Sequence, residues 1–191
     1  LDSNRIKSLD GKLFENLNNL RILELKNNQI SKIDQKSFRN LTKLILLNLE
    51  NNCIFQLDKS LLVSNNQLTY LNLAKNVLRK IKLFNFENLF SLKSLNLSYN
   101  NITEIEDGSF NNLKNLEELS LRFNGLKDLN ANIFKNLFKL KLLDLSNNSI
   151  ESIQPKCFFY NLNLEVLNLE NNRIKYLDHA IFSNLKRLET I

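Results

Sequence analysis

Leucine recurs along the chain at a fixed interval of 24 residues. The first leucine of each copy is followed three and five positions later by two more, with a polar residue between them. This alternation with a period of two is typical of a short strand that buries one face. The pattern predicts one strand per copy, and the leading leucines are Leu20, Leu44, Leu68, Leu92, Leu116, Leu140, Leu164 and Leu188.

Two further positions are nearly constant among the copies when the leading leucine is counted as position 0. Position 8 is always asparagine, which we expect to end the strand, to turn the backbone through left-handed dihedrals and to hydrogen-bond buried backbone groups. This asparagine ladder comprises Asn4, Asn28, Asn52, Asn76, Asn100, Asn124, Asn148 and Asn172. Position 18 is phenylalanine in every copy except the one with Leu62, and we expect it to fill the far side of the core. This phenylalanine column comprises Phe14, Phe38, Phe86, Phe110, Phe134, Phe158 and Phe182.

The copies follow one another without insertion or deletion. They divide the chain into a partial repeat at 1–19, seven complete repeats at 20–187 and a partial repeat at 188–191. One short strand cannot bury its apolar face alone, whereas stacked copies form a parallel sheet with a continuous core behind it. We therefore expect a single α/β repeat array over 1–191, without terminal caps. Acids at position 14 are expected to cap the segment that carries the phenylalanine, and they are Asp10, Asp34, Asp58, Glu106 and Asp178.

The combined pattern L-x-x-L-x-L-x-x-N-x-[IL]-x-x-[IL]-x-x-x-x-F-x-x-L resembles the leucine-rich repeat family over the whole chain. The period of 24 with its phenylalanine is similar to the extracellular subclass found in Toll-like receptor, Slit and chaoptin ectodomains. The resemblance implies a right-handed, horseshoe-shaped solenoid with a parallel sheet on its concave face and short helical, 3₁₀ or irregular segments on its convex face. It also implies an extracellular or cell-surface location and a protein ligand on the concave sheet. Because that subclass usually carries Cys-rich caps, we interpret the chain as part of a longer array or as one whose ends a partner covers.

Composition and charge sharpen this interpretation. Of the 191 residues, 42 are leucine and 34 are asparagine, and the 43% hydrophobic share excludes intrinsic disorder. No apolar run is long enough to span a membrane. The net charge of +6 favours an anionic partner such as nucleic acid. However, strand positions 2, 4 and 6 together hold six acids and two bases, a net charge of −4, which leaves +10 for the other positions. We therefore do not expect nucleic acid as the partner of the concave face. The positive charge collects on the two flanks of the strands, which leaves anion binding at a flank, including nucleic acid, as a less favoured alternative.

Aromatic and apolar side chains are expected on the same concave face. Tyr70, Tyr99 and Phe123 come from three consecutive copies, so we expect them within about 15 Å of one another. Arg122 and Glu118 border them, and aromatic anchors with a charged rim are typical of protein-binding hot spots. The candidate ligand-binding residues are Tyr70, Tyr99, Phe123, Arg122, Glu118, Leu46, Glu24, Glu50 and Asp144.

The cysteines and the histidine point to no catalytic or metal chemistry. Cys53 and Cys157 lie four copies apart, about 19 Å along the stack, which exceeds the roughly 7 Å limit between the Cα atoms of a disulfide. His179 is the only histidine, so we expect no metal cluster and no Ser-His-Asp or Cys-His nucleophile. We also expect no cofactor and no enzymatic activity.

Four N-x-[ST] triplets are present. Asn40, Asn101 and Asn147 are candidate glycosylation sites, whereas a glycan on Asn96 would block the concave face. The abundance of asparagine makes such triplets expected by chance, so they carry no weight for location.

The sequence thus predicts a non-catalytic module that recognises a protein ligand in a receptor or adhesion protein. Two alternatives stay open. One is a structural role in which open repeat ends associate with each other or with a larger assembly, and the other is an innate immune sensor of the Toll type.

Overall fold

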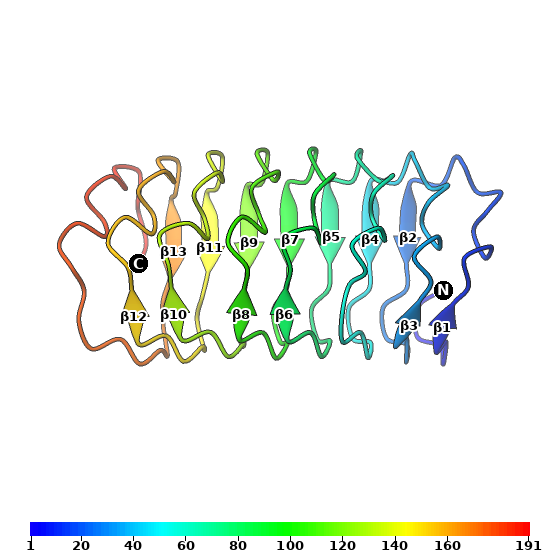
Figure 1. Ribbon diagram of the computed structural model, residues 1–191, viewed down its shortest axis with the longest axis horizontal. Coiled ribbons are helices and arrows are strands. Elements are labelled where there is room, and N and C mark those ends of the chain that lie inside the picture. The colour runs from blue at the N-terminus through cyan, green and yellow to red at the C-terminus, as the bar shows by residue number, and fades with distance from the viewer.

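The structure is a computed structural model that describes residues 1–191 as a row of coils standing side by side (Figure 1). One strand from each of seven coils joins a single parallel sheet in the order β13-β11-β9-β7-β5-β4-β2. Neighbouring strands pair so that residues 24 positions apart lie opposite each other, as Leu23 does with Leu47 and Leu47 with Leu71. The sheet strands are β2 (Ile22–Glu24), β4 (Leu46–Asn48), β5 (Tyr70–Asn72), β7 (Ser94–Asn96), β9 (Glu118–Ser120), β11 (Leu142–Asp144) and β13 (Val166–Asn168).

The predicted solenoid with a parallel sheet is confirmed. The leucine at the centre of every sheet strand is buried, and it belongs to one continuous cluster of 47 buried residues that runs the length of the stack. The structure contains no helix with the length and apolar character that crossing a membrane requires.

The asparagine at position 8 holds the turn that ends each sheet strand. The side-chain amide of Asn76 donates to the carbonyl oxygens of Leu49, Leu73 and Ala74 at 3.0 to 3.2 Å, and its Oδ1 accepts from the backbone N–H of Ile54 at 2.9 Å. The flanking coils repeat this pattern. Seven of the eight ladder asparagines therefore bond four backbone groups of two coils, and the exception is Asn4, which bonds only Leu1 and Asp2 of its own coil. The N–H held by each Oδ1 would cost about 1–3 kcal/mol if it were left without a partner.

The left-handed backbone lies one residue earlier than the sequence predicts. Position 8 must point its side chain into the stack to reach the carbonyl oxygens, so the reversal of the chain falls on position 7, whose side chain points outward. The values of φ lie between 51° and 56° at Ser3, Asn27, Asn51, Lys75, Tyr99, Phe123, Asn147 and Asn171.

The convex wall consists of turns and two-residue parallel strands, without helices. Of the segment types expected there, the irregular one is observed, and the short strands are an addition. They are β1 (Ser8–Leu9), β3 (Lys32–Ile33), β6 (Lys80–Ile81), β8 (Glu104–Ile105), β10 (Asp128–Leu129) and β12 (Ser152–Ile153).

The position-14 acids mostly cap turns rather than helices. The Oδ1 atoms of Asp10, Asp34, Asp58 and Asp178 each accept from the backbone N–H two residues further on at 2.8 to 2.9 Å. Glu106 differs, because its carboxylate accepts from the N–H of Leu83 in the preceding coil and pairs with Lys80 at 2.9 Å.

The convex strands occur only in pairs: β1 with β3, β6 with β8, and β10 with β12. The phenylalanines of the same three coil pairs stack with ring centroids 5.9 to 6.3 Å apart. The coil between the first two pairs carries Leu62 in place of phenylalanine and has no convex strand. Hollows of about 620 and 310 Å³ lie on either side of its segment 54–59. The concave wall is therefore continuous, and the convex wall is divided into blocks of two coils.

Two buried asparagines allow a matched test of the ladder. Asn65 is fully buried where most coils have leucine, and its Oδ1 has no hydrogen-bond partner. We expect Asn76→Leu to lower the free energy of unfolding by about 3 kcal/mol, since it leaves the buried N–H of Ile54 without a partner and removes one of the two partners of the carbonyl oxygens of Leu49, Leu73 and Ala74. The same change at Asn65 removes an unpaired polar atom, and the carbonyl oxygens of Phe38 and Leu41 that its amide contacts keep backbone donors, so we expect stability to stay level or rise by about 1 kcal/mol. Urea denaturation of both variants measures this difference, and equal losses would contradict the role assigned to the ladder.

Candidate functional site

The outer face of the seven-stranded sheet presents the residues that the sequence selects for binding. Leu46, Tyr70 and Glu118 begin β4, β5 and β9, and the register places Tyr70 directly beside Leu46. Glu24 and Asp144 end β2 and β11. The face is therefore a row of single strand positions contributed by successive coils.

Tyr99 and Phe123 form a stacked pair just beyond the ends of β7 and β9. Their ring centroids lie 4.4 Å apart with an interplanar angle of 16°, which matches the spacing of about 4.8 Å between neighbouring strands. The side chains are still 42% and 36% exposed. The sheet thus presents two adjacent rings, held parallel, to solvent.

Arg122 completes this group. Its guanidinium carbon lies 4.8 Å from the ring centroid of Phe123 and 5.9 Å from that of Tyr99, within the range of cation–π attraction. Arg122 makes no ion pair with a carboxylate, so the two rings are its charge-stabilising neighbours.

The aromatic pair occupies strained backbone positions. Tyr99 and Phe123 adopt φ values of 54° and 51°, a left-handed conformation that costs a bulky L-residue about 1–2 kcal/mol. Four other coils place asparagine at this position, and there Asn51 donates to Asn27 at 2.9 Å. Two adjacent coils therefore replace a hydrogen-bonded ladder with exposed, strained rings, and such strain is typical of functional sites.

The acids of the face differ in availability. Glu50 accepts from the Nζ of Lys75 at 2.7 Å and from the side-chain amide of Asn72 at 3.1 Å, and Glu118 accepts from the hydroxyl of Ser94 at 3.1 Å. These carboxylates stay at the surface with free acceptor capacity.

Two other predicted acids, Asp144 and Glu24, have carboxylate oxygens that are engaged in a turn or buried. The Oδ1 of Asp144 accepts from the backbone N–H of Ser146 at 3.0 Å, so this carboxylate supports the turn after β11. The Oε2 of Glu24 is buried without a hydrogen-bond partner.

Tyr70 stands apart from the stacked pair. It begins its strand, whereas Tyr99 follows the end of the next one, so the two differ by five positions, or about 16 Å along the strand direction. Burial, together with the charges of Glu50 and Glu24, raises the pKa of Tyr70 above its ordinary value. The structure thus brings together two of the three predicted aromatic residues and leaves the third in an acidic region.

Lys75 is the neighbour that sequence reasoning missed. It occupies position 7 in the coil before Tyr99 and neutralises Glu50, so the charge near the pair is less negative than a count of positions 2, 4 and 6 indicates. The signal was present in the position-7 series, where lysine, tyrosine and phenylalanine interrupt a run of asparagines.

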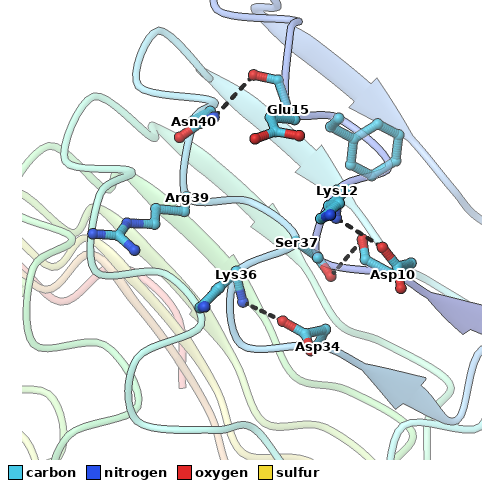
Figure 2. Close-up of a pocket in the computed structure, with 10 residues that line it drawn as sticks. Asp10, Lys12, Glu15, Asp34, Lys36, Ser37, Arg39 and Asn40 are labelled. Atoms are coloured by element: carbon cyan, nitrogen blue, oxygen red, sulfur yellow. Dashed lines mark hydrogen bonds between the residues drawn. The ribbon is translucent and has the colours of Figure 1, made fainter.

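A hollow of about 450 Å³ lies on the convex side of the first two coils (Figure 2). Its lining contains three acids and three bases, and its polar groups are engaged in the turns. The carboxylates of Asp10 and Asp34 accept from backbone N–H groups, and the side chain of Asn40 donates to the carbonyl oxygen of Glu15 at 2.9 Å (Figure 2). This balanced, internally bonded lining favours no ligand.

The candidate glycosylation sites differ in the freedom of their side chains. Asn101 is exposed and makes no side-chain hydrogen bond, whereas Asn147 accepts from Asn171 at 3.4 Å. Asn96 accepts from both the N–H and the hydroxyl of Ser98, so its amide belongs to the turn. Glycosylation of Asn40, Asn101 and Asn147 stays a prediction.

The cysteines and the histidine lie apart from this face. Both cysteines are free: Cys53 is exposed, and burial raises the pKa of the Cys157 thiol to about 12. His179 is almost fully exposed, 3.6 Å from the carboxylate of Asp178.

Comparison with known proteins identifies the family to which this fold belongs. The family profile described as Leucine rich repeat matches residues 1–54, 19–78, 66–126, 90–150, 114–161 and 138–191. No curated protein matches the chain in sequence.

Several solved structures share the fold. A TLR13–ssRNA13 complex has a TM-score of 0.91 and 32% identity over 96% of this chain and 26% of that chain. A leucine-rich repeat protein of Leptospira interrogans has a TM-score of 0.87 and 26% identity over 98% of this chain and 46% of that one. Toll in the Drosophila Toll–Spätzle complex has a TM-score of 0.83 and 24% identity over 100% of this chain and 30% of that one. The chain therefore spans less than half the length of these neighbours.

The strain at position 7 predicts that the aromatic pair lowers stability. We expect Tyr99→Asn combined with Phe123→Asn to raise the melting temperature by about 3 °C. Relief of two left-handed aromatics at about 1 kcal/mol each outweighs the loss of about 1 kcal/mol of ring stacking. The reverse change, Asn51→Tyr, should lower it by a similar amount. Calorimetry measures both shifts, and a large loss of stability in the double asparagine variant would show that the rings hold the fold together.

The two thiols should differ in reactivity. Because the thiolate is the reactive form, and Cys157 is buried with a raised pKa, we expect a colorimetric thiol reagent at pH 8 to label one thiol per native chain. Both thiols should react after unfolding in urea. Cys53→Ser is the control, and it should remove the native-state reaction completely.

Proposed function

The chain belongs to the leucine-rich repeat family, and from that premise we propose that it is a non-catalytic recognition module that binds a protein ligand on its concave sheet. The observation that carries the proposal is the stacked, exposed pair of Tyr99 and Phe123, held at a cost in backbone strain. Leucine-rich repeat proteins are in general binding modules without enzymatic activity.

The composition of the face supports a protein as ligand. Exposed apolar side chains at Ile22 and Leu142 begin β2 and β11 on the same face of the sheet, and polar strand residues separate them from the aromatic pair. An apolar centre with Tyr, Phe and Arg and a polar surround is typical of protein interfaces. We infer that the aromatic pair with Arg122 is the hot spot, with the ion pair of Lys75 and Glu50 in the adjacent coil, whereas Glu118 lies five positions away at the start of β9.

Charge argues for a protein over nucleic acid on this face. The neighbour TLR13 is seen with a single-stranded RNA, but the concave positions of the present chain carry a net charge of −4. A phosphate backbone needs cations to replace its counterions. We propose a ligand with a basic or neutral surface.

A receptor or adhesion protein at the cell surface is the setting that we propose for this module, on the basis of the family subclass. Association of the chain with itself is the alternative role. It predicts a mass that rises with concentration in light scattering, whereas a recognition module with a separate ligand keeps the mass of one chain.

The test uses two variants with equal loss of exposed aromatic surface. Tyr99→Ser with Phe123→Ser removes the proposed hot spot, and adding Tyr70→Ser removes the third predicted aromatic. Phe55→Ser with Phe84→Ser is the control, because these residues are 55% and 48% exposed but lie outside the concave sheet. Immobilised wild-type and variant chains are exposed to extracellular fluid of the source organism, and the captured proteins are identified and titrated.

We expect a ligand captured by the wild type and the control to bind the Tyr99 and Phe123 variant at least about 30-fold more weakly, as for loss of a hot spot. The Tyr70 change should add little. Equal affinity of all variants, with circular dichroism showing intact folds, would exclude the concave aromatic pair as the site.

A further inference from the structure

The flank that leads into the sheet strands changes character along the chain. Position 22 lies in the turn just before each strand. It is a neutral polar residue in the first coils and an apolar or basic residue in the later ones. The series runs Asn18, Thr42, Asn66, Phe90, Lys114, Phe138, Leu162 and Lys186.

Phe159 and Tyr160 join this flank and pack edge to face, with ring centroids 5.2 Å apart and an interplanar angle of 80°. We call Phe90, Phe138, Phe159, Tyr160 and Leu162 the aromatic rim, and each is 38% to 54% exposed. A large apolar side chain at this exposure shows about 90 Å², so the rim presents roughly 450 Å². Apolar patches of a few hundred Å² are the largest that typical monomers expose, and they are often functional.

The exposure of Tyr160 is not imposed by the repeat. At the same position 20, Asn40, Asn112 and Asn184 donate to backbone carbonyls of the preceding coil at 2.7 to 3.2 Å. Tyr160 gives up this bond between coils and places a ring in solvent. The departure therefore resembles the one at Tyr99 and Phe123, on the other edge of the sheet.

Positive charge without acidic partners surrounds the rim. Lys135 places its Nζ 5.7 Å from the ring centroid of Tyr160, and Lys139 donates to Asn115. Neither of these lysines, nor Lys114, forms an ion pair with a carboxylate. By contrast, Lys93 and Lys141 on the same flank both pair with Glu117.

We propose that the aromatic rim docks the chain peripherally on an anionic lipid membrane surface. The rim residues lie in the turns that precede β7, β11 and β13, with Lys114 in the intervening turn before β9, so they share one flank of the array. Aromatic and leucine side chains enter the interfacial region of a bilayer, while neighbouring lysines attract anionic headgroups. Protruding side chains of this kind suit a deformable headgroup layer better than a rigid protein surface, which would need a matching groove.

This docking surface is separate from the proposed ligand site. The rim precedes the sheet strands, whereas Tyr99 and Phe123 follow them, so both surfaces can be occupied together. A loss at one surface is therefore distinguishable from a loss at the other.

The experiment measures binding to vesicles of phosphatidylcholine with about one-third phosphatidylserine, by flotation at low and at physiological salt. We expect the wild type to bind these vesicles and to bind pure phosphatidylcholine vesicles much more weakly. Phe90→Ser with Phe138→Ser and Leu162→Ser should weaken binding at least about tenfold. Lys114→Gln with Lys135→Gln and Lys139→Gln should weaken it by about ten- to a hundredfold and remove the preference for phosphatidylserine.

Two controls separate docking from folding. Phe55→Ser with Phe84→Ser removes equally exposed aromatics off the rim and should leave binding unchanged. Tyr160→Asn restores the asparagine bond between coils, so it should raise the melting temperature while it weakens vesicle binding. Absence of vesicle binding by the wild type, or equal binding by all variants, overturns the proposal. The proposal is also overturned if a rim variant keeps its binding to vesicles but no longer captures a protein, because that result assigns the rim to a protein partner.

Discussion

The fold depends on hydrogen-bonding the backbone at the end of every sheet strand. With only three glycines and one proline, the chain closes these turns with the position-8 asparagine, which bonds backbone groups of its own coil and of the coil before. A ladder residue such as Asn76 must therefore keep its distance from the preceding coil. An inserted residue would carry its amide out of reach and leave several buried groups without partners. The strict period of 24 residues follows from this constraint, and variation is confined to side chains that point away from it.

Sequence reasoning succeeded where structure repeats with the period. The strands, the ladder and the phenylalanine column each depend on one residue type at a fixed position. Because that residue recurs from copy to copy, a single chain shows the same rule many times. It failed where structure depends on distances between particular coils. Nothing local to Leu62 shows that its coil lacks a convex strand, because such a strand exists only by pairing with a neighbouring coil. The ion pair of Lys75 with Glu50 likewise depends on which rotamers meet across two coils.

The departures from the repeat are the residues on which both proposals rest. Tyr99, Phe123 and Tyr160 each stand where other coils use an asparagine that bonds its neighbour, and each exposes a ring instead. Replacing asparagine with an exposed aromatic residue adds backbone strain or removes a hydrogen bond between coils. Stability of the fold alone therefore does not favour the replacement. Charge is also unevenly distributed. The concave face is acidic and the adjacent flank is basic, and the net charge of the whole chain conceals this difference.

The division of the convex wall into two-coil blocks has a mechanical consequence. In a bent beam, the side held by an unbroken bond network resists extension, and deformation concentrates where the opposite side is discontinuous. Here the sheet is the continuous side, and segment 54–59 has a hollow on each flank, so we expect bending to concentrate at this segment. Such bending would alter the angle between the first coils and the coils that carry Tyr99, Phe123 and the aromatic rim, while the hydrogen bonds of the sheet stay in place.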